Sequence, residues 1–239
     1  MWSTGDSLDG SAILGRMLGA DGPGGSLVDR MVDDLATRII DGRLPPGADV
    51  NSVELARRYG SSRTPVREAL LRLQREGLVD IPARRRPRVA LVTLAQVRET
   101  YEVRACLHGM VSELIVRDTG DDGLAVLRGL QDRLRLDAER ADLDAYFWRN
   151  VEFRQAEAEV SGNRQLARML ASLGLRTLQL RRLSLSFQGR LAQSVADHER
   201  LLNAYAGRDA PLAVAITKSI IMGGYRAIEA SGWSGLEAE

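Results

Sequence analysis

Apolar residues between positions 26 and 92 recur at helical spacing in three segments, which are followed by two β-prone stretches. In the first segment they repeat every three or four positions, and Gly42 follows where a helix C-cap is expected. Ser52 can cap a second, shorter helix that ends at Gly60. The third segment predicts a helix with one buried face, formed by Val66, Ala69, Leu70 and Leu73.

The third helix begins and ends at residues with strong local preferences. Thr64 is a natural N-cap, Pro65 a natural first helical residue and Gly77 a natural stop. The stretches 78–81 and 89–92 are β-prone, and the segment between them is basic. Helix, short helix, helix and two-stranded ribbon is the order of a winged helix-turn-helix, which we predict for this region.

From residue 93 onward the pattern is almost entirely helical. Thr93 and Gln96 can form a capping box for a long helix that runs to about Arg117. Further helices are predicted near 123–140, 142–160, 163–186, 190–206 and 211–230. Because six helices with short connections pack as an antiparallel bundle, the predicted fold class is mainly α: an N-terminal winged helix-turn-helix and a C-terminal all-α antiparallel helical bundle.

Length and glycine content set the predicted domain boundaries. A chain of 239 residues is comfortable for two domains. Seven glycines in residues 1–25 predict a flexible tail, with one short helical turn near Ile13–Leu18. We therefore expect a tail over 1–25, a winged helix-turn-helix domain over 26–92, a helical domain over 93–231 and a second tail over 232–239.

The overall composition favours a globular protein of the cytoplasm. Apolar residues make up 44% of the chain and charged residues 27%, and no apolar run approaches the roughly 18–20 residues of a membrane span. The N-terminus lacks the basic flank and small-residue cleavage site of a signal peptide. Cys106 is the single cysteine, so no intramolecular disulfide is expected and a reducing cytoplasm is the simplest location.

The arginines are concentrated in the winged helix-turn-helix region. Ten arginines and five acidic residues lie between Asp49 and Arg88, so this segment carries +5 on a chain whose net charge is +1. Such a basic block is typical of contact with a polyanion. Arg63 and Arg67 stand at the start of the third helix, where the macrodipole disfavours cations. In a helix-turn-helix this end enters the major groove and meets phosphate, so the two arginines favour DNA binding.

Several motifs at fixed spacing carry a resemblance to a known family. In the first half they are Gly42–Gly47 (GRLPPG), Glu54–Ala56 (ELA), Ser62–Leu70 (SRTPVREAL) and Glu76–Val79 (EGLV). In the second half they are Tyr101–Arg104 (YEVR), Ser161–Asn163 (SGN), Asp197-His198, Arg208-Asp209 and Ala213. With these motifs, residues 27–230 resemble bacterial transcription regulators of the GntR family, FadR-like (FCD) subfamily. The resemblance implies a homodimer on a palindromic double-stranded DNA operator, with an affinity that a small molecule inside the helical bundle alters, and we expect a repressor.

The resemblance also implies which residues touch DNA. Recognition-helix contacts are expected from Arg63, Thr64 and Arg67, and Ser62 with the helix start is expected to hold phosphate. The wing departs from the family pattern, because Arg86 stands about where relatives have a glycine. The expected wing contacts are Arg84, Arg85 and Arg86, which suit the negative potential of a narrow minor groove. Arg88 fits DNA contact and a plain solvated charge equally well, and Val53 replaces an arginine that touches DNA in many relatives.

The helical domain departs further from the resemblance. Many FadR-like proteins hold a divalent metal through an Asp, a His one turn later and two later His residues. Asn150, Arg154, His198 and Ile220 stand at those positions here, so we expect no metal and no cofactor. The expected effector is instead a small carboxylate that binds Arg154 directly, with Arg104, Asn150 and His198 as further contacts.

Alternatives to these interpretations remain open from the sequence. Arg154 can instead pair at the surface with Glu152, Glu157 or Glu159, leaving His198 as a hydrogen-bonded relic. The effector can instead be an acyl-CoA thioester, or the protein can be a ligand-independent or architectural DNA-binding regulator. We expect no enzyme, because the chain has two histidines and no nucleophile–base pair, phosphate loop or paired-carboxylate motif.

Overall fold

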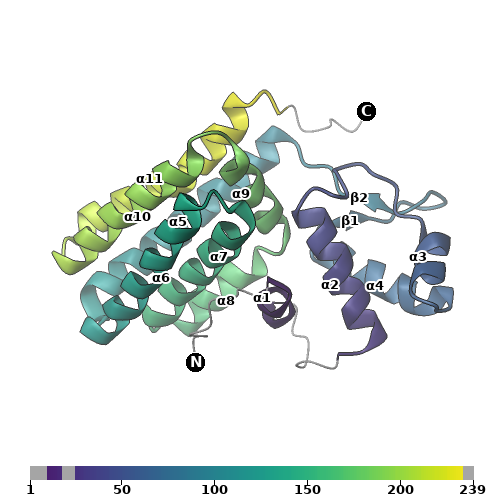
Figure 1. Ribbon diagram of the computed structural model, residues 1–239, viewed down its shortest axis with the longest axis horizontal. Helices are drawn as coiled ribbons and strands as arrows, with labels where there is room; N and C mark the ends of the chain where they lie inside the picture. The colour runs from purple at the N-terminus through teal and green to yellow at the C-terminus, as the bar shows by residue number, and fades with distance from the viewer. Residues whose placement is uncertain (1–9, 18–24, 234–239) are drawn as a thin grey trace. The chain divides into compact units, whose positions relative to one another are not determined.

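The computed structural model describes residues 10–17 and 25–233, which form two compact units (Figure 1). The N-terminal unit holds the described residues up to Thr93 together with Gly174–Leu180. The C-terminal unit holds Leu94–Leu173 and Arg181–Trp233. The expected fold class, a winged helix-turn-helix followed by an all-helical bundle, is confirmed in these two units.

The N-terminal unit is built on four helices, α1 (Gly10–Met17), α2 (Leu27–Ile40), α3 (Ser52–Arg58) and α4 (Arg63–Arg75). Helix α1 lies within the segment that we expected to be a flexible tail with one short helical turn near Ile13–Leu18; it overlaps that turn but is longer, and Ile13 and Leu14 are buried where it packs on α2. The rest of the expected tails, 1–9, 18–24 and 234–239, lies outside the described residues. Apolar burial of this kind stabilises a helix that glycine content alone does not predict.

Helix α4 has the predicted buried face, but its first residue differs from the prediction. Val66, Ala69, Leu70 and Leu73 are at most 2% exposed. The N-cap is Ser62, with extended backbone, and Thr64 lies inside the first turn. Asn51 likewise replaces Ser52 as the cap of α3, because its side chain accepts hydrogen bonds from two backbone amides. Both errors arise because adjacent Ser, Thr and Asn residues are all competent caps.

The wing is a two-stranded antiparallel ribbon, shorter than the two predicted stretches. Strand β1 (Val79–Asp80) pairs with β2 (Arg88–Val89), with Val79 opposite Val89. The segment between them carries Arg84 at φ 62°, in the left-handed region. This is an uncommon backbone conformation for a residue other than glycine.

Residues 174–180 belong to the N-terminal unit and donate hydrogen bonds to the C-terminal ends of two of its helices. Arg176 Nε donates to the Gly77 carbonyl oxygen, just beyond α4, at 2.9 Å. Gln179 Nε2 donates to the carbonyl oxygen of Ile39, in the last turn of α2, at 3.4 Å. Carbonyl groups at helix C-termini lack intrahelical donors, and a cation there also complements the helix dipole.

The C-terminal unit contains the remaining seven helices of the described chain. They are α5 (Leu94–Asp118), α6 (Asp121–Glu139), α7 (Leu143–Val160), α8 (Arg164–Ser172), α9 (Arg176–Ser186), α10 (Arg190–Ala206) and α11 (Ala210–Ala230), of which α9 begins within the N-terminal unit. The single helix expected over 163–186 is therefore two helices. They separate at Gly174, whose φ of 74° a helix cannot accommodate. In the described part of the chain, every helix is too short or too polar to cross a membrane.

Helices α5 and α11 pack in opposite directions along most of their lengths (Figure 1). Gly224, late in α11, lies against Tyr101, early in α5, and an added Cβ would come within 2.9 Å of the tyrosine ring. At the other end, Gly109 lies against Val214 and Lys218. The antiparallel packing brings Tyr101 and Arg104 beside α11, where they line a pocket.

Candidate functional site

The leading end of α4 presents a set of exposed polar side chains with no role inside the unit. Ser62, Arg63, Thr64 and Arg67 are all exposed. Ser62 makes no side-chain capping bond, so the first backbone N–H groups of α4 have no side-chain partner from the cap. Among the described residues, neither the Arg63 nor the Arg67 side chain forms a hydrogen bond or ion pair. The four predicted contact residues therefore share one solvent-facing end of a helix.

Other arginines of the same unit are held by acidic partners. Arg72, on the opposite side of α4 from Arg67, forms a 2.5 Å ion pair with Asp29 of α2. Arg38 and Arg58 both lie 3.8 Å from Asp34. These pairs fix the packing of α2, α3 and α4. The unit thus separates arginines that stabilise its fold from arginines that face outward.

The wing adds three more outward-facing guanidinium groups. Arg84, Arg85 and Arg86 are exposed and, within the described chain, have no ion-pair partner. Arg88 differs, because its Nε lies 4.0 Å from Asp80 across the ribbon. The geometry therefore favours a structural role for Arg88 within the ribbon, which is neither of the two interpretations that the sequence leaves open, DNA contact and a plain solvated charge.

In the C-terminal unit, three of the expected effector residues line one pocket. Arg104 of α5 and Asn150 and Arg154 of α7 come together there, each about 95% buried. Two further arginines, which the sequence interpretation missed, complete the lining: Arg181 of α9 and Arg190 of α10. We call this space the arginine pocket, defined by Arg104, Arg154, Arg181 and Arg190.

Arg154 is paired with a glutamate, as one sequence interpretation proposed, but the pair is buried and not at the surface. Its Nη1 donates to Glu157 Oε2 at 2.7 Å, and Glu157 is 1% exposed. The other Glu157 oxygen accepts from the Tyr205 hydroxyl at 2.8 Å. Tyr205 in turn lies 2.8 Å from the Ser112 hydroxyl. The charge of Arg154 is therefore largely compensated from within the bundle.

His198 lies behind Arg154 and not on the pocket wall. Arg154 Nη2 donates to His198 Nε2 at 3.1 Å, so Nε2 is the acceptor and the ring proton belongs on Nδ1. The imidazole also stacks on Phe153, with 4.6 Å between ring centroids. Burial, reinforced by Arg154, lowers the pKa of His198 well below its ordinary value of 6.5. His198 is therefore a neutral imidazole that holds the Arg154 guanidinium in place through this hydrogen bond.

Burial and neighbouring like charges both disfavour the cations around the arginine pocket. Burial, followed by repulsion from Arg104 and Arg154, lowers the pKa of Arg181 well below its ordinary value. Burial also lowers the pKa of Arg104, with Arg154 adding to the effect. His108 is buried, and its pKa is lowered well below 6.5 by burial and the same arginines. Guanidinium groups stay protonated at neutral pH, so the shifts of the arginines reflect first the cost of burying a cation and then the repulsion between neighbouring cations.

The expected metal positions converge, but their chemistry does not suit a metal. Asn150, Arg154 and Ile220 line the pocket, and His198 is bonded to Arg154. One amide, one guanidinium, one alkyl group and an engaged imidazole do not make a divalent metal site. No group of three or more His, Cys, Asp or Glu side chains is placed to hold a metal ion in the ranges 10–17 and 25–233.

The arginine pocket is small, and both polar and aliphatic side chains form its wall. Its interior space is about 40 Å³, enough for roughly three water molecules or one compact oxyanion. Leu185, Ile220 and Ile221 supply most of its aliphatic surface. Pockets for larger ligands span roughly 300–1,000 Å³, so a long acyl chain has no room in this conformation.

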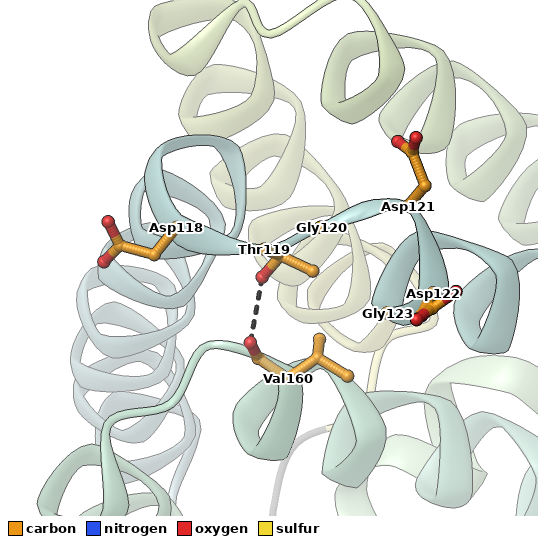
Figure 2. Close-up of a pocket in the computed structure, with 7 residues that line it drawn as sticks. All are labelled: Asp118, Thr119, Gly120, Asp121, Asp122, Gly123 and Val160. Atoms are coloured by element: carbon orange, nitrogen blue, oxygen red, sulfur yellow. Dashed lines mark hydrogen bonds between the residues drawn. The ribbon is translucent and has the colours of Figure 1, made fainter.

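A second hollow lies at the turn between α5 and α6 and is lined by acidic residues (Figure 2). Asp121 and Asp122 occupy the first turn of α6, where acids complement the helix dipole. The Thr119 hydroxyl donates to the Val160 carbonyl oxygen at 2.8 Å and ties this turn to α7. Asp118 and Asp121 point away from each other in Figure 2, so the hollow does not gather ligands for a cation.

Each of the two units matches the model of a known protein family. Residues 27–89 match the family model for bacterial regulatory proteins of the gntR family, and residues 99–222 match that of the FCD domain. The second match alone spans more than half of the chain.

Relatives in sequence and structure agree with these matches. The chain is 32% identical over 172 residues to an uncharacterized HTH-type transcriptional regulator in an unstable DNA locus of Streptomyces ambofaciens, over 71% of each protein. It is 26% identical over 188 residues to the probable D-xylose utilization operon transcriptional repressor of Paenarthrobacter nicotinovorans, over 79% of this chain and 82% of that one. With two other curated relatives the alignment spans less than two thirds of their length, 62% and 61%. The solved structure of E. coli McbR/YncC superposes with a TM-score of 0.72 at 26% identity, over 86% of this chain and 98% of that chain.

Proposed function

The chain belongs to the GntR family of bacterial regulatory proteins and is a transcriptional regulator, not an enzyme, and from this premise we propose a specific mode of action. The protein is a cytoplasmic homodimeric repressor that binds a palindromic operator through α4 and the wing. A small anionic metabolite, a carboxylate in the simplest case, enters the arginine pocket without a metal and changes the affinity for DNA.

The single observation that carries the DNA-binding part is the unpaired state of the arginines at the front of α4. Arg63 and Arg67 are exposed where the helix dipole disfavours cations, while Arg72 of the same helix is paired with Asp29. Guanidinium groups at a recognition-helix N-terminus can form bidentate hydrogen bonds to guanine. Ser62 and the first backbone N–H groups are suited to a phosphate. Contact with DNA therefore explains why Arg63 and Arg67 stand at the N-terminal end of α4, where they do not stabilise the fold.

The wing extends the same surface chemistry to a second groove. Arg84, Arg85 and Arg86 have no internal partner among the described residues, and a narrow minor groove attracts guanidinium groups. Phosphate contacts from the wing add affinity that is independent of base sequence. We therefore assign base recognition to α4 and mainly electrostatic attraction to the wing.

The DNA-binding proposal is tested by selecting duplexes from a random-sequence pool with the full chain and measuring their affinity by fluorescence anisotropy. The expected result is a palindromic consensus bound at least 10³-fold more tightly than unrelated DNA. Equal affinity for selected and unrelated duplexes would contradict the proposal, because the protein would then only attract the DNA backbone.

The effector proposal rests on a cluster of cations in the C-terminal unit, of which Arg104 is buried and Arg181 and Arg190 are partly exposed. Arg104, Arg181 and Arg190 line a small pocket, with Asn150 as a hydrogen-bonding partner for an oxyanion. Guanidinium–carboxylate pairing is strong and directional. The small volume disfavours the acyl-CoA alternative, and the concentration of buried charge disfavours a protein that has lost its ligand. His198 contributes by holding Arg154, not by direct contact.

Helix α9 offers a route from the arginine pocket to DNA. Its residues up to Leu180 belong to the N-terminal unit, and its residues from Arg181 belong to the C-terminal unit. An anion that draws Arg181 toward the pocket pulls on a helix whose first turn is bonded to Gly77 through Arg176. We expect Arg176→Gln to leave ligand binding unchanged and to reduce the ligand's effect on operator affinity. An undiminished effect in this variant would exclude the α9 route.

The homodimer proposal has a candidate surface on α5. Val103 and Met110 are 49% and 48% exposed, and with the exposed Cys106 they follow helical spacing on one face. Replacing both Val103 and Met110 by glutamate should yield a monomer in size-exclusion chromatography with light scattering. Leu136→Glu on α6 is the matched control, since Leu136 is 45% exposed. A dimer that survives the double substitution would place the interface elsewhere.

A further inference from the structure

The arginine pocket holds more positive charge than its surroundings neutralise. Of its four guanidinium groups, Arg154 is paired with Glu157. Arg104 lies over the Tyr101 ring, 4.8 Å from its centroid, and has no acidic partner among the described residues. Arg181 and Arg190 also have no acidic partner among the described residues, and the Nε of Arg190 is buried without a hydrogen-bond partner. About three positive charges therefore remain without an ion-pair partner around the pocket, one on the buried Arg104 and two on the partly exposed Arg181 and Arg190.

Such an arrangement is unfavourable unless a ligand offsets it. Unpaired buried charges are costly, and like charges raise the cost further in a medium of low dielectric constant. Burial, and after it repulsion from Arg104 and Arg154, lowers the pKa of Arg181, in keeping with this cost. Each of the three arginines comes from a different helix, α5, α9 or α10, so their donors approach the pocket from different directions. A monovalent carboxylate would leave most of this charge in place.

We propose that the arginine pocket binds a compact dianion, with its oxygen atoms shared among Arg104, Arg181 and Arg190 and with Asn150 donating a further hydrogen bond. This inference rests on the proposed effector role and specifies the ligand class. The shared chemistry is two negative charges on neighbouring oxygen atoms, which a short dicarboxylate and a phosphoryl or sulfuryl group both provide. Arg154, already compensated by Glu157, orders the pocket and supplies little net charge.

The spacing of these residues along their helices supports a built site and not accidental burial. On α5, Arg104 continues a buried stripe that contains Val97, Tyr101 and Val111. On α9, Arg181 lies between the buried Leu178 and Leu185 at intervals of three and four residues. Apolar residues normally occupy such positions, because burying an unpaired cation destabilises a fold. A ligand that supplies the missing negative charge removes this conflict.

The experiment compares three small anions on the full chain without DNA. Sulfate, malonate and acetate are titrated by isothermal calorimetry at constant ionic strength, so that general screening is equal. We expect sulfate, malonate or both to bind at least tenfold more tightly than acetate. Tighter binding of sulfate identifies a tetrahedral group, and tighter binding of malonate identifies a dicarboxylate. Equal binding of acetate and the two dianions would overturn the proposal.

Variants locate the binding and separate it from nonspecific effects. Arg181→Gln and Arg190→Gln should each weaken binding of the preferred dianion about tenfold or more, while Arg128→Gln, at an exposed position on α6, should not change it. Without ligand, the thermal midpoint of Arg181→Gln should equal or exceed that of the wild type, because an unpaired cation is removed. A lower midpoint with unchanged anion affinity would show a purely structural arginine and overturn the proposal.

The outcome is distinguishable from failure of the proposed function. Dianion binding at the arginine pocket without any change in operator affinity would uphold this inference and contradict the regulatory role. If the protein binds its operator specifically but binds dianions no more tightly than acetate, this inference is contradicted and the DNA-binding part of the proposed function stands. The two measurements share no reagent other than the protein.

Discussion

Replacing Arg67 by alanine removes an exposed guanidinium group that has no hydrogen-bond or ion-pair partner within the described chain. Exposed substitutions of this kind change the free energy of unfolding by about 0.5 kcal/mol or less. Alanine is also the best helix former, and removing a cation near a helix N-terminus is favourable by a few tenths of a kcal/mol. The fold of Arg67→Ala should therefore be as stable as the wild type or slightly more stable.

The same substitution should weaken operator binding strongly. A bidentate arginine–guanine contact contributes about 1–3 kcal/mol of discrimination, and a homodimer loses one contact in each half-site. The expected loss is about 2–6 kcal/mol, which corresponds to a reduction in affinity of roughly thirtyfold or more. The affinity is measured by fluorescence anisotropy on the selected operator, and the stability by thermal circular dichroism on the same samples.

Arg75→Ala is the matched control, because it removes the same charge from an exposed position on the same helix. Arg75 lies eight residues beyond Arg67, about 12 Å further along the helix axis. Its removal should change affinity far less than that of Arg67. Equal affinity of Arg67→Ala and wild type, or equal losses in the two variants, would refute the assignment of α4's leading end to base contacts.

Three further predictions concern charge and protonation. Replacing residues 84–86 by glutamine should lower the slope of log affinity against log salt by up to about 0.9 for each lost phosphate contact, and an unchanged slope would exclude the wing from DNA. The pKa values of His108 and His198 lie well below 6.5, so the unfolded chain binds protons that the folded chain excludes. The free energy of unfolding, from urea titrations, should therefore fall by about 2 kcal/mol between pH 6.5 and 5.5, and replacing both histidines should abolish most of this fall. Glu157→Ala should destabilise the fold by about 3–5 kcal/mol, because Arg154 stays buried without its partner, and a loss under 1 kcal/mol would argue against the pair.

Local sequence pattern was sufficient for the DNA-binding end of the molecule. The buried face of α4 follows from apolar spacing alone, and Gly77, at φ 72°, ends the helix as predicted. The choice between Ser62 and Thr64 as N-cap was not decidable, since both side chains suit the position. Residues 10–17 became helical through packing on α2, a tertiary contact that glycine content does not reveal.

The arginine pocket could be predicted only in part, because its walls come from five helices, α5, α7, α9, α10 and α11. Asn150 and Arg154 were found through their positions in the family pattern, and they do lie together. Arg181 and Arg190 were missed, although the sequence contains a signal for Arg181. It occupies a position where the buried stripe of α9 calls for an apolar residue, between Leu178 and Leu185. A charged residue at a position where helical spacing predicts a buried apolar one is therefore a sequence signal for a candidate ligand-binding site.

The most direct measurement of the central claim places a DNA-cleaving iron chelate on the outer face of α4. In a Cys106→Ser background, the chelate is attached through Leu71→Cys, one turn beyond Arg67, or through Leu136→Cys on α6 as a control; the two leucines are 39% and 45% exposed. On the selected operator, the α4 chelate should cut in two clusters, one in each half-site, about 10 base pairs or a multiple apart, whereas the α6 chelate should give no clusters. Uniform cutting from both positions, or no cutting from α4, would contradict the claim that the front of this helix enters a groove of DNA.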